Sequence, residues 1–201
     1  MSLAVAALAQ RISEAHGSLR SLGEQRPLIV AIDGRSGTGK STLAAAVAEQ
    51  LNARPLTAQV IDGDDFYAGG VTVRPEPPEV LAGLCIDWRR QREVLQTLRA
   101  GERAQWHPFD WDAFDGSLSP ELHSCEPCDA VLLEGVYSAR AELADLLDLR
   151  VLLTVPDEVR LSRLLAREGE LGPWERQWHA AEACYLDETS ARAFDLVIKD
   201  A

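Results

Sequence analysis

Short apolar runs alternate along the chain with segments in which apolar residues recur every three or four positions. The runs are typical of buried strands and occupy residues 27–33, 58–61, 130–133, 150–155 and 196–198. The periodic segments predict helices at residues 41–52, 87–100, 140–147, 156–168 and 174–188. This alternation predicts an α/β fold in which helices cover both faces of a parallel sheet.

The N-terminal segment, residues 1–24, is predicted to form an amphipathic helix ahead of the first strand. Charged residues interrupt this segment, and it lacks the basic start of a secretion signal. Nowhere does the sequence contain the run of about 18 apolar residues that a membrane span needs. We therefore expect a cytoplasmic protein with no membrane partner.

Composition narrows the class of protein further. The 201 residues suit one domain, residues 1–201, and the net charge of −12 gives a surface that repels a phosphate backbone. We therefore expect no nucleic-acid partner. Cys125 and Cys128 form a C-x-x-C pair, but no second pair with metal-binding spacing accompanies it, so free thiols are expected.

A glycine-rich stretch at residues 34–41, GRSGTGKS, matches the phosphate-loop pattern G-x-x-x-x-G-K-[ST] without a mismatch. A strand is predicted before it and a helix after it, as the pattern requires. Lys40 is expected to reach the β- and γ-phosphates of ATP, and the Ser41 hydroxyl to bind Mg²⁺. The residues predicted to bind the nucleotide here are Gly34, Ser36, Gly37, Thr38, Gly39, Lys40, Ser41 and Thr42.

Two large classes of nucleotide-binding protein are excluded by the rest of the sequence. Besides Lys40, the one other lysine is Lys199, close to the C-terminus, so a guanine-binding N-K-x-D motif cannot be formed. The signature of ABC transporters is also missing. A chain of this size with a phosphate loop and neither motif indicates a small-molecule kinase.

Four blocks in the sequence resemble the uridine kinase family and its relatives, phosphoribulokinase and pantothenate kinase. They are the phosphate loop, D-D-F-Y at residues 64–67, L-E-G-V-Y at 133–137, and the arginine-rich segment 160–167. Their order and spacing agree across residues 27–168. The resemblance implies a three-layer P-loop NTPase fold with a helical lid at residues 156–176. It also implies transfer of the γ-phosphoryl group of ATP to a hydroxyl.

A kinase must deprotonate or orient the acceptor hydroxyl, and a carboxylate near the γ-phosphate commonly does this. The resemblance implies that Asp64 is this base, although Asp62 and Asp65 are near enough in sequence to be alternatives. Asp64 could instead orient Mg²⁺ through water. Glu134 follows a predicted strand, where parallel sheets place their ligands, and the resemblance implies that it holds metal-bound water or the acceptor. The metal candidates are therefore Ser41, Asp64 and Glu134.

Arg160, Arg163 and Arg167 follow the spacing i, i+3, i+7, which places them within about 60° on one helix face. Clustered positive charges need an anion or an acidic partner, and the phosphates of ATP are one candidate. The resemblance puts this helix in the lid, with Arg160 binding ATP and with Arg163 and Arg167 stabilising the transferred group. The alternative is a solvated face whose arginines pair with Asp157 and Glu168.

The acceptor site is predicted from weaker similarities at Tyr67, Asp87, Phe109 and Trp111. Uridine kinases read the pyrimidine with a tyrosine and a histidine, where this chain has Phe109 and Phe114. Uridine and cytidine are therefore not the expected acceptors.

Several carboxylates and tryptophans fall in this same region, which favours a neutral or cationic hydroxylated acceptor. An anionic acceptor would require Arg74, Arg89 or Arg90 to turn inward.

These observations predict an ATP- and Mg²⁺-dependent kinase for a nucleoside-like or other small hydroxyl acceptor. A sugar or vitamin-precursor kinase of the same fold is an alternative acceptor class. A nucleotide-binding regulatory module without phosphoryl transfer is an alternative function. The sequence leaves a monomer and a homodimer equally open.

Overall fold

A parallel five-stranded sheet forms the centre of the computed structural model, which describes residues 2–189 and 193–199. The strand order is β2-β5-β1-β6-β7, and every neighbouring pair is parallel. The strands are β1 (Leu28–Asp33), β2 (Ala58–Asp62), β5 (Ala130–Glu134), β6 (Leu149–Thr154) and β7 (Leu196–Lys199). β1 and β5 are buried along their whole length, as their continuous apolar runs predict. The predicted α/β fold with a parallel sheet is confirmed.

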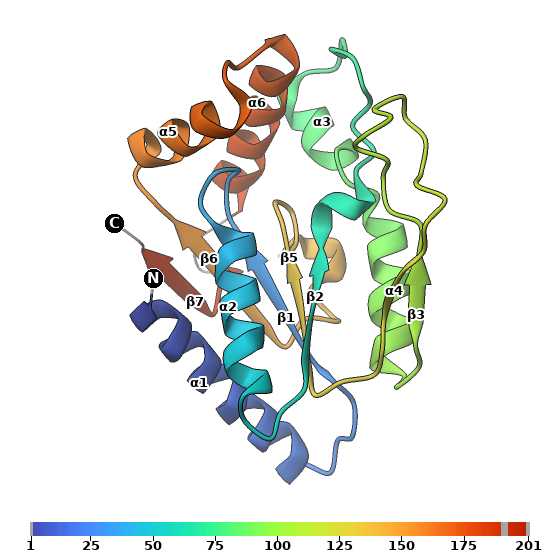
Figure 1. The fold of residues 1–201 in the computed structure, drawn as a ribbon, viewed down its shortest axis with the longest axis vertical. Coiled ribbons are helices and arrows are strands. Elements are labelled where there is room, and N and C mark those ends of the chain that lie inside the picture. Colours follow the sequence, from blue (N-terminus) through green and yellow to red (C-terminus); the bar gives the residue numbers. More distant parts are fainter. Residues whose placement is uncertain (1, 190–192, 200–201) are drawn as a thin grey trace.

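Helices cover both faces of this sheet because successive strand residues point to opposite sides. On one face, α1 (Ser2–Ser21) and α2 (Lys40–Asn52) pack with Val30 and Ile32 of β1. On the other face, Ile29 joins a second core with α3 (Pro78–Leu84) and α4 (Trp88–Arg99). The three layers place the β1–α2 loop at one end of the sheet, below α5 (Asp157–Glu168) and α6 (Pro173–Glu188) (Figure 1).

Three elements differ from the sequence predictions. The helix expected at residues 140–147 is a short 3₁₀ turn, η2 (Ala141–Leu143). The spacing of Leu143 and Leu146, both buried, fits a 3₁₀ turn as well as a helix, because residues three apart then share one side.

The sequence patterns did not predict α3, which begins at Pro78 after a proline-containing stretch without helix or strand. A proline at the first helical position suits a helix start, because its missing N–H would have no partner there.

A separate antiparallel pair of strands, β3 (Ala104–Trp106) and β4 (His123–Cys125), was not predicted. Both strands are too short to show a clear periodicity. β3 packs beside α4, and Trp106 of β3 and His123 of β4 hydrogen-bond the Asp65 carboxylate in η1 (Gly63–Phe66), the 3₁₀ turn that follows β2.

In the part of the chain that the structure describes, every helix is too short or too polar to cross a membrane.

Candidate active site

The phosphate loop runs from Gly34 to Gly39 between β1 and α2 and lies tightly against its neighbours. Gly34 has φ +148°, and a Cβ atom there would clash with the carbonyl oxygen of Leu153 on β6. Gly37 has φ +81°, and a Cβ atom there would lie 2.8 Å from the carbonyl oxygen of Arg160 on α5. Only glycine fits these two positions, so the sequence of the loop fixes how closely β6 and α5 approach it.

A cavity of about 340 Å³ opens at the N-terminus of α2, and we call it the phosphate cavity. Lys40 begins α2, is 8% exposed, and donates through Nζ to the carbonyl of Arg35 at 3.2 Å. A buried cation, the amides of the loop and the positive end of a helix together make a site for a polyphosphate. Its lining includes the predicted Ser36, Gly37, Gly39, Lys40, Ser41, Thr42, Asp64, Glu134, Arg163 and Arg167. Gly34 and Thr38 belong to the loop but do not line this cavity.

Carboxylates gather where β2 and β5 end. Asp62 and Glu134 are register partners on these two neighbouring strands, which puts both at the carboxyl edge of the sheet. Asp64 lies in η1, directly after β2, and its amide donates to the Asp62 carboxylate at 2.9 Å. The sheet therefore brings together three acidic residues beside Lys40.

The carboxylates affect one another's protonation. Restricted solvation, together with the nearby charges of Asp62 and Glu134, raises the pKa of Asp64 to about 7, and Lys40 opposes this rise. Burial and the charge of Asp62 also raise the pKa of Glu134, whereas hydrogen bonding from Ser41 and the charge of Lys40 lower it. The cluster therefore favours a further positive charge.

The oxygen donors at this edge fit a magnesium ion. Mg²⁺ is usually held by one or two protein oxygens together with phosphate oxygens and water. Ser41, Asp64 and Glu134 line the same cavity and supply such oxygens. Within residues 2–189 and 193–199, no three His, Cys, Asp or Glu side chains are grouped so that they could hold a metal alone.

A second cavity, of about 380 Å³, lies on the far side of Asp64, and we call it the aromatic cavity. Trp111, Trp174 and Trp178 form much of its wall. Three residues line both cavities: Ser36, Asp64 and Arg167. The two cavities therefore meet between the phosphate loop, η1 and the end of α5.

The arginine face of α5 is turned toward the phosphate loop. Arg160 is 4% exposed and donates to the Ser36 carbonyl at 3.4 Å, while Arg163 donates to the Thr38 carbonyl at 3.1 Å. Arg167 lines both cavities. Thus the three arginines share one face, as their spacing predicts.

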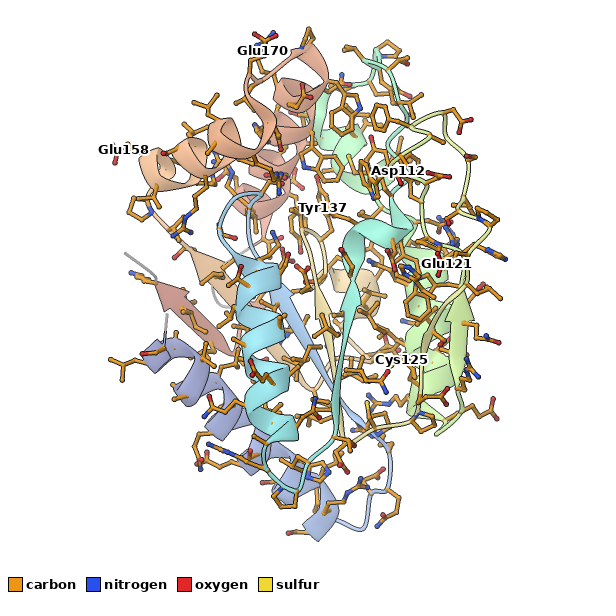
Figure 2. The ribbon with its side chains drawn as sticks, in the orientation of Figure 1. Asp112, Glu121, Cys125, Tyr137, Glu158 and Glu170 are labelled. Carbon is orange, nitrogen blue, oxygen red and sulfur yellow. The ribbon has the colours of Figure 1, made fainter. Side chains whose placement is uncertain are left out.

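The pairs expected for a solvated face are also present. Arg160 binds Asp157 at 3.1 Å and Arg167 binds Glu168 at 2.5 Å. Arg160 does not line the phosphate cavity; it supports the loop from behind and lines a neighbouring cavity with Thr38, so its contact with ATP stays a prediction. Glu158 on α5 and Glu170, between α5 and α6, lie at the outer edge of the molecule, away from the loop (Figure 2).

Three of the four residues predicted to bind the acceptor lie at the aromatic cavity, and the fourth lies elsewhere. Trp111 lines the aromatic cavity, and Tyr67 and Phe109 lie behind it, with ring centres 5.0 Å and 4.7 Å from that of Trp111. Asp87 instead caps α4 by accepting hydrogen bonds from the amides of Arg89 and Arg90. It lines neither of the two cavities, so its predicted role in acceptor binding gains no support.

Two buried carboxylates that the sequence reading missed hold the phosphate loop. Glu182 on α6 is fully buried and accepts hydrogen bonds from the amide and the hydroxyl of Ser36, the first at 3.1 Å. Asp33 ends β1 and accepts from the amides of Gly34 and Ala139 and from the Tyr185 hydroxyl.

Asp33 stands at the end of an apolar strand, directly before the phosphate loop, and this position could have identified it in the sequence. Glu182 gave no such signal, because its partner lies 146 residues away. Tyr137, one residue past the E-G-V segment, lies inside the molecule below the lid (Figure 2) and contacts Tyr185 and Trp178.

Comparisons with known proteins show what the chain is similar to in sequence and fold. A family model described as adenylylsulphate kinase matches residues 26–70, which contain the phosphate loop and η1. The uridine kinase of Limosilactobacillus reuteri (strain DSM 20016) is 25% identical over 148 residues, covering 72% of this chain and 66% of that protein. The uridine kinase of Lactiplantibacillus plantarum is 26% identical over 153 residues, covering 72% and 69%. The first match therefore spans slightly less than two thirds of that relative's length.

Solved structures share the fold over nearly the whole chain. A "Possible Uridine Kinase" from Bacillus stearothermophilus has a TM-score of 0.66 at 20% identity and covers 95% of this chain and 98% of that one. The D-glycerate 3-kinase of Cryptococcus neoformans has a TM-score of 0.69 at 17% identity, with coverage of 97% and 95%. The resemblance carried by the sequence motifs is confirmed: the chain is similar to uridine kinases and shares the fold of P-loop kinases.

Proposed function

We propose that the protein is a kinase that transfers the γ-phosphoryl group of ATP to a hydroxyl of a small neutral or cationic acceptor. The observation that carries this proposal is the meeting of the two cavities at Ser36, Asp64 and Arg167. ATP in the phosphate cavity and an acceptor in the aromatic cavity would bring their reacting groups together at this junction. Such positioning is the main requirement of phosphoryl transfer.

The nucleotide is bound by the loop amides, the N-terminus of α2 and the ammonium group of Lys40. Ser41 and Glu134, with Asp64 beside them, would hold the Mg²⁺ ion, which when bound offsets the phosphate charge. Arg163 and Arg167 supply further positive charge from the lid. Arginine suits this role because its planar group can bind two phosphate oxygens at once.

Asp64 acts as the base. It accepts the proton of the acceptor hydroxyl while the acceptor oxygen bonds to the γ-phosphorus and the bond from that phosphorus to ADP breaks. A carboxylate with a pKa near 7 suits this work near neutral pH.

The two alternatives are less suited to act as the base. Asp62 accepts the amide of Asp64, and Asp65 is engaged by the Trp106 indole and the His123 ring, both at 2.7 Å. Among the three aspartates, Asp64 alone lines both cavities.

The whole chain, residues 1–201, would work as one cytoplasmic kinase domain, with the segment 156–176 as its lid. Its partners are ATP and the acceptor, with no role for nucleic acid or membrane. The absence of a polar pyrimidine reader at Phe109 and Phe114 argues against uridine. Both side chains pack into the aromatic cluster instead, with ring centres 6.2 Å apart.

A screen for ADP formation tests this function directly. The purified chain, with MgATP, is offered nucleosides, sugars, amino alcohols and vitamin precursors, and Lys40→Ala serves as the control that cannot hold ATP. We expect at least one acceptor to raise ADP formation in the natural chain and not in the control. Tight MgATP binding with no acceptor-dependent turnover across the panel would instead favour the regulatory module.

A further inference from the structure

We propose that the aromatic cavity takes a hydroxylated amine, that is, an acceptor with a positively charged ammonium group beside its hydroxyls. The inference rests on the proposed kinase function for the fate of the hydroxyl. The preference for positive charge can be tested by binding alone. The inference narrows the expected acceptors from neutral or cationic compounds to cationic ones.

The wall of the cavity is built from aromatic faces. Trp174 and Trp178 lie one turn apart on α6 with their ring planes 13° apart and their centres separated by 6.3 Å. Trp111 is 42% exposed, an unusual exposure for tryptophan, and its ring opens onto the cavity. Tyr67 contacts all three rings from behind. Stacked and tilted rings of this kind attract a cation through their electron-rich faces.

The polar atoms of Trp174, Trp178 and Tyr67 are already used within the protein. The Trp174 indole donates to the Gly70 carbonyl at 3.1 Å, and the Tyr67 hydroxyl donates to the same carbonyl at 2.6 Å. The Trp178 indole donates to the Ser36 hydroxyl at 3.2 Å. The wall therefore offers a ligand its ring faces rather than these donors.

The charged groups around the cavity are mostly hydrogen-bond acceptors. Asp62, Asp64, Glu168 and Glu175 line it, and Arg167, the one arginine or lysine in the lining, is paired with Glu168. His179 adds no positive charge, because burial lowers its pKa below the ordinary value. A positively charged nitrogen, with or without N–H donors, brings an opposite charge and no acceptor, so it complements this surface.

The arginines that could have neutralised an anionic acceptor are engaged elsewhere. Arg74 binds Glu76 at 2.5 Å. Arg89 lies over the ring of its neighbour Trp88, and Arg90 donates to the carbonyl of His107. None of the three lines the aromatic cavity. An anionic acceptor there would lie among several carboxylates that repel it. A cationic acceptor would instead be attracted by their negative charge.

Binding of two matched probes tests the charge preference. Choline and its uncharged isostere 3,3-dimethylbutan-1-ol have the same shape and hydroxyl, and both are titrated into the full chain while tryptophan fluorescence is recorded. We expect choline to bind at least roughly tenfold more tightly, the size of a cation–π contact aided by carboxylates. Equal affinities, or no saturable choline signal up to about 0.1 M, would overturn the inference.

Substitutions of residues that line the aromatic cavity test whether choline binds there. Trp111→Leu, at an exposed position, and Glu175→Gln, at a half-buried one, should each weaken choline binding several-fold. Trp88→Phe removes a tryptophan outside the cavity and should leave the choline affinity unchanged. Unaltered affinity in both cavity variants would place the cation elsewhere and overturn the proposal.

A turnover comparison separates this inference from the proposed function. Glucosamine and N-acetylglucosamine differ in charge at the amino position, and we expect more ADP formation with glucosamine. Faster turnover of the neutral sugar would overturn the inference and leave the kinase function standing. Selective choline binding without turnover of any hydroxylated amine would overturn the proposed kinase function and leave the preference for a cation standing.

Discussion

The carboxylate of Glu182 accepts hydrogen bonds from both the amide and the hydroxyl of Ser36, the loop residue at which the two cavities meet. Trp178, one turn earlier on α6, donates to the same hydroxyl. A fully buried negative charge thus occupies a loop amide of the kind that binds phosphate oxygens. Because α6 also carries the Trp174 and Trp178 wall, this contact joins the phosphate loop to the wall of the aromatic cavity.

Replacing Glu182 with glutamine keeps its shape and removes its charge. We expect Glu182→Gln to bind MgATP roughly three- to tenfold more tightly, because the γ-phosphate no longer faces a buried like charge, and to lose about 1–2 kcal/mol of unfolding free energy with the charge-assisted hydrogen bonds. Calorimetric titration and denaturant unfolding measure the two effects. The matched control is Glu158→Gln, on the outer side of α5. Equal or weaker MgATP binding in Glu182→Gln would show that the two negative charges do not compete.

The close approach of α5 to the phosphate loop makes Gly37 intolerant of a side chain. In Gly37→Ala the added Cβ meets the carbonyl of Arg160 and an unfavourable φ, so we expect a loss of about 1–3 kcal/mol of stability and of MgATP binding. Gly83→Ala in α3 is the control, since nothing lies within 4 Å of its Cβ position. A helical glycine-to-alanine change in open space should stabilise the chain by about 0.5–1 kcal/mol. Thermal unfolding that moves the two variants in the same direction would refute this packing account.

The carboxylate cluster predicts an unusual effect of pH on the unliganded protein. The folded-state pKa of Asp64 is raised to about 7, so its contribution to stability is greatest when the group is protonated and is lost as pH rises through 7. The raised pKa values of Asp33, Asp62 and Glu134 act in the same direction. We therefore expect the thermal midpoint to fall between about pH 4 and 7, to level off above 7, and to fall less in Asp64→Asn. If the thermal midpoints of the natural chain and of Asp64→Asn fall in parallel with pH, Asp64 is not the cause of the fall.

The same shift predicts the pH dependence of catalysis. A base must be unprotonated to accept a proton, so kcat/KM for the acceptor should rise with pH, with a midpoint near or below 7. Saturating MgATP should move this midpoint down, because a bound cation lowers the pKa of a nearby carboxylate. Initial rates from pH 5 to 8 at two magnesium concentrations check this. A rate independent of pH over this range would contradict Asp64 as the base.

Much of the nucleotide site followed from local sequence. The strands are continuous apolar runs, and the phosphate loop carries its own pattern of glycines, so the place of Lys40 at the start of α2 could be predicted. Glu134 was expected at a strand end, and its register with Asp62 on the neighbouring strand follows from the parallel pairing.

The rest depends on contacts between distant residues. Asp65 is bound by Trp106 and His123, 41 and 58 residues away, and this contact ties the small sheet to the turn that carries Asp64. Arg160 had the spacing of a phosphate ligand, yet its burial behind Gly37 is decided by how α5 packs. Asp87 matched a family position, but here the nearest amides, at the start of α4, take up its carboxylate.

Single-turnover transfer by Asp64→Asn tests the central claim, that a phosphoryl group passes between the two cavities under the control of Asp64. Radiolabelled ATP is bound to excess enzyme, an acceptor identified in the screen is added, and the labelled product is followed with time. We predict that Asp64→Asn binds MgATP at least as tightly as the natural chain and transfers the label roughly 10²-fold or more slowly. Transfer at the natural rate in Asp64→Asn would contradict the account.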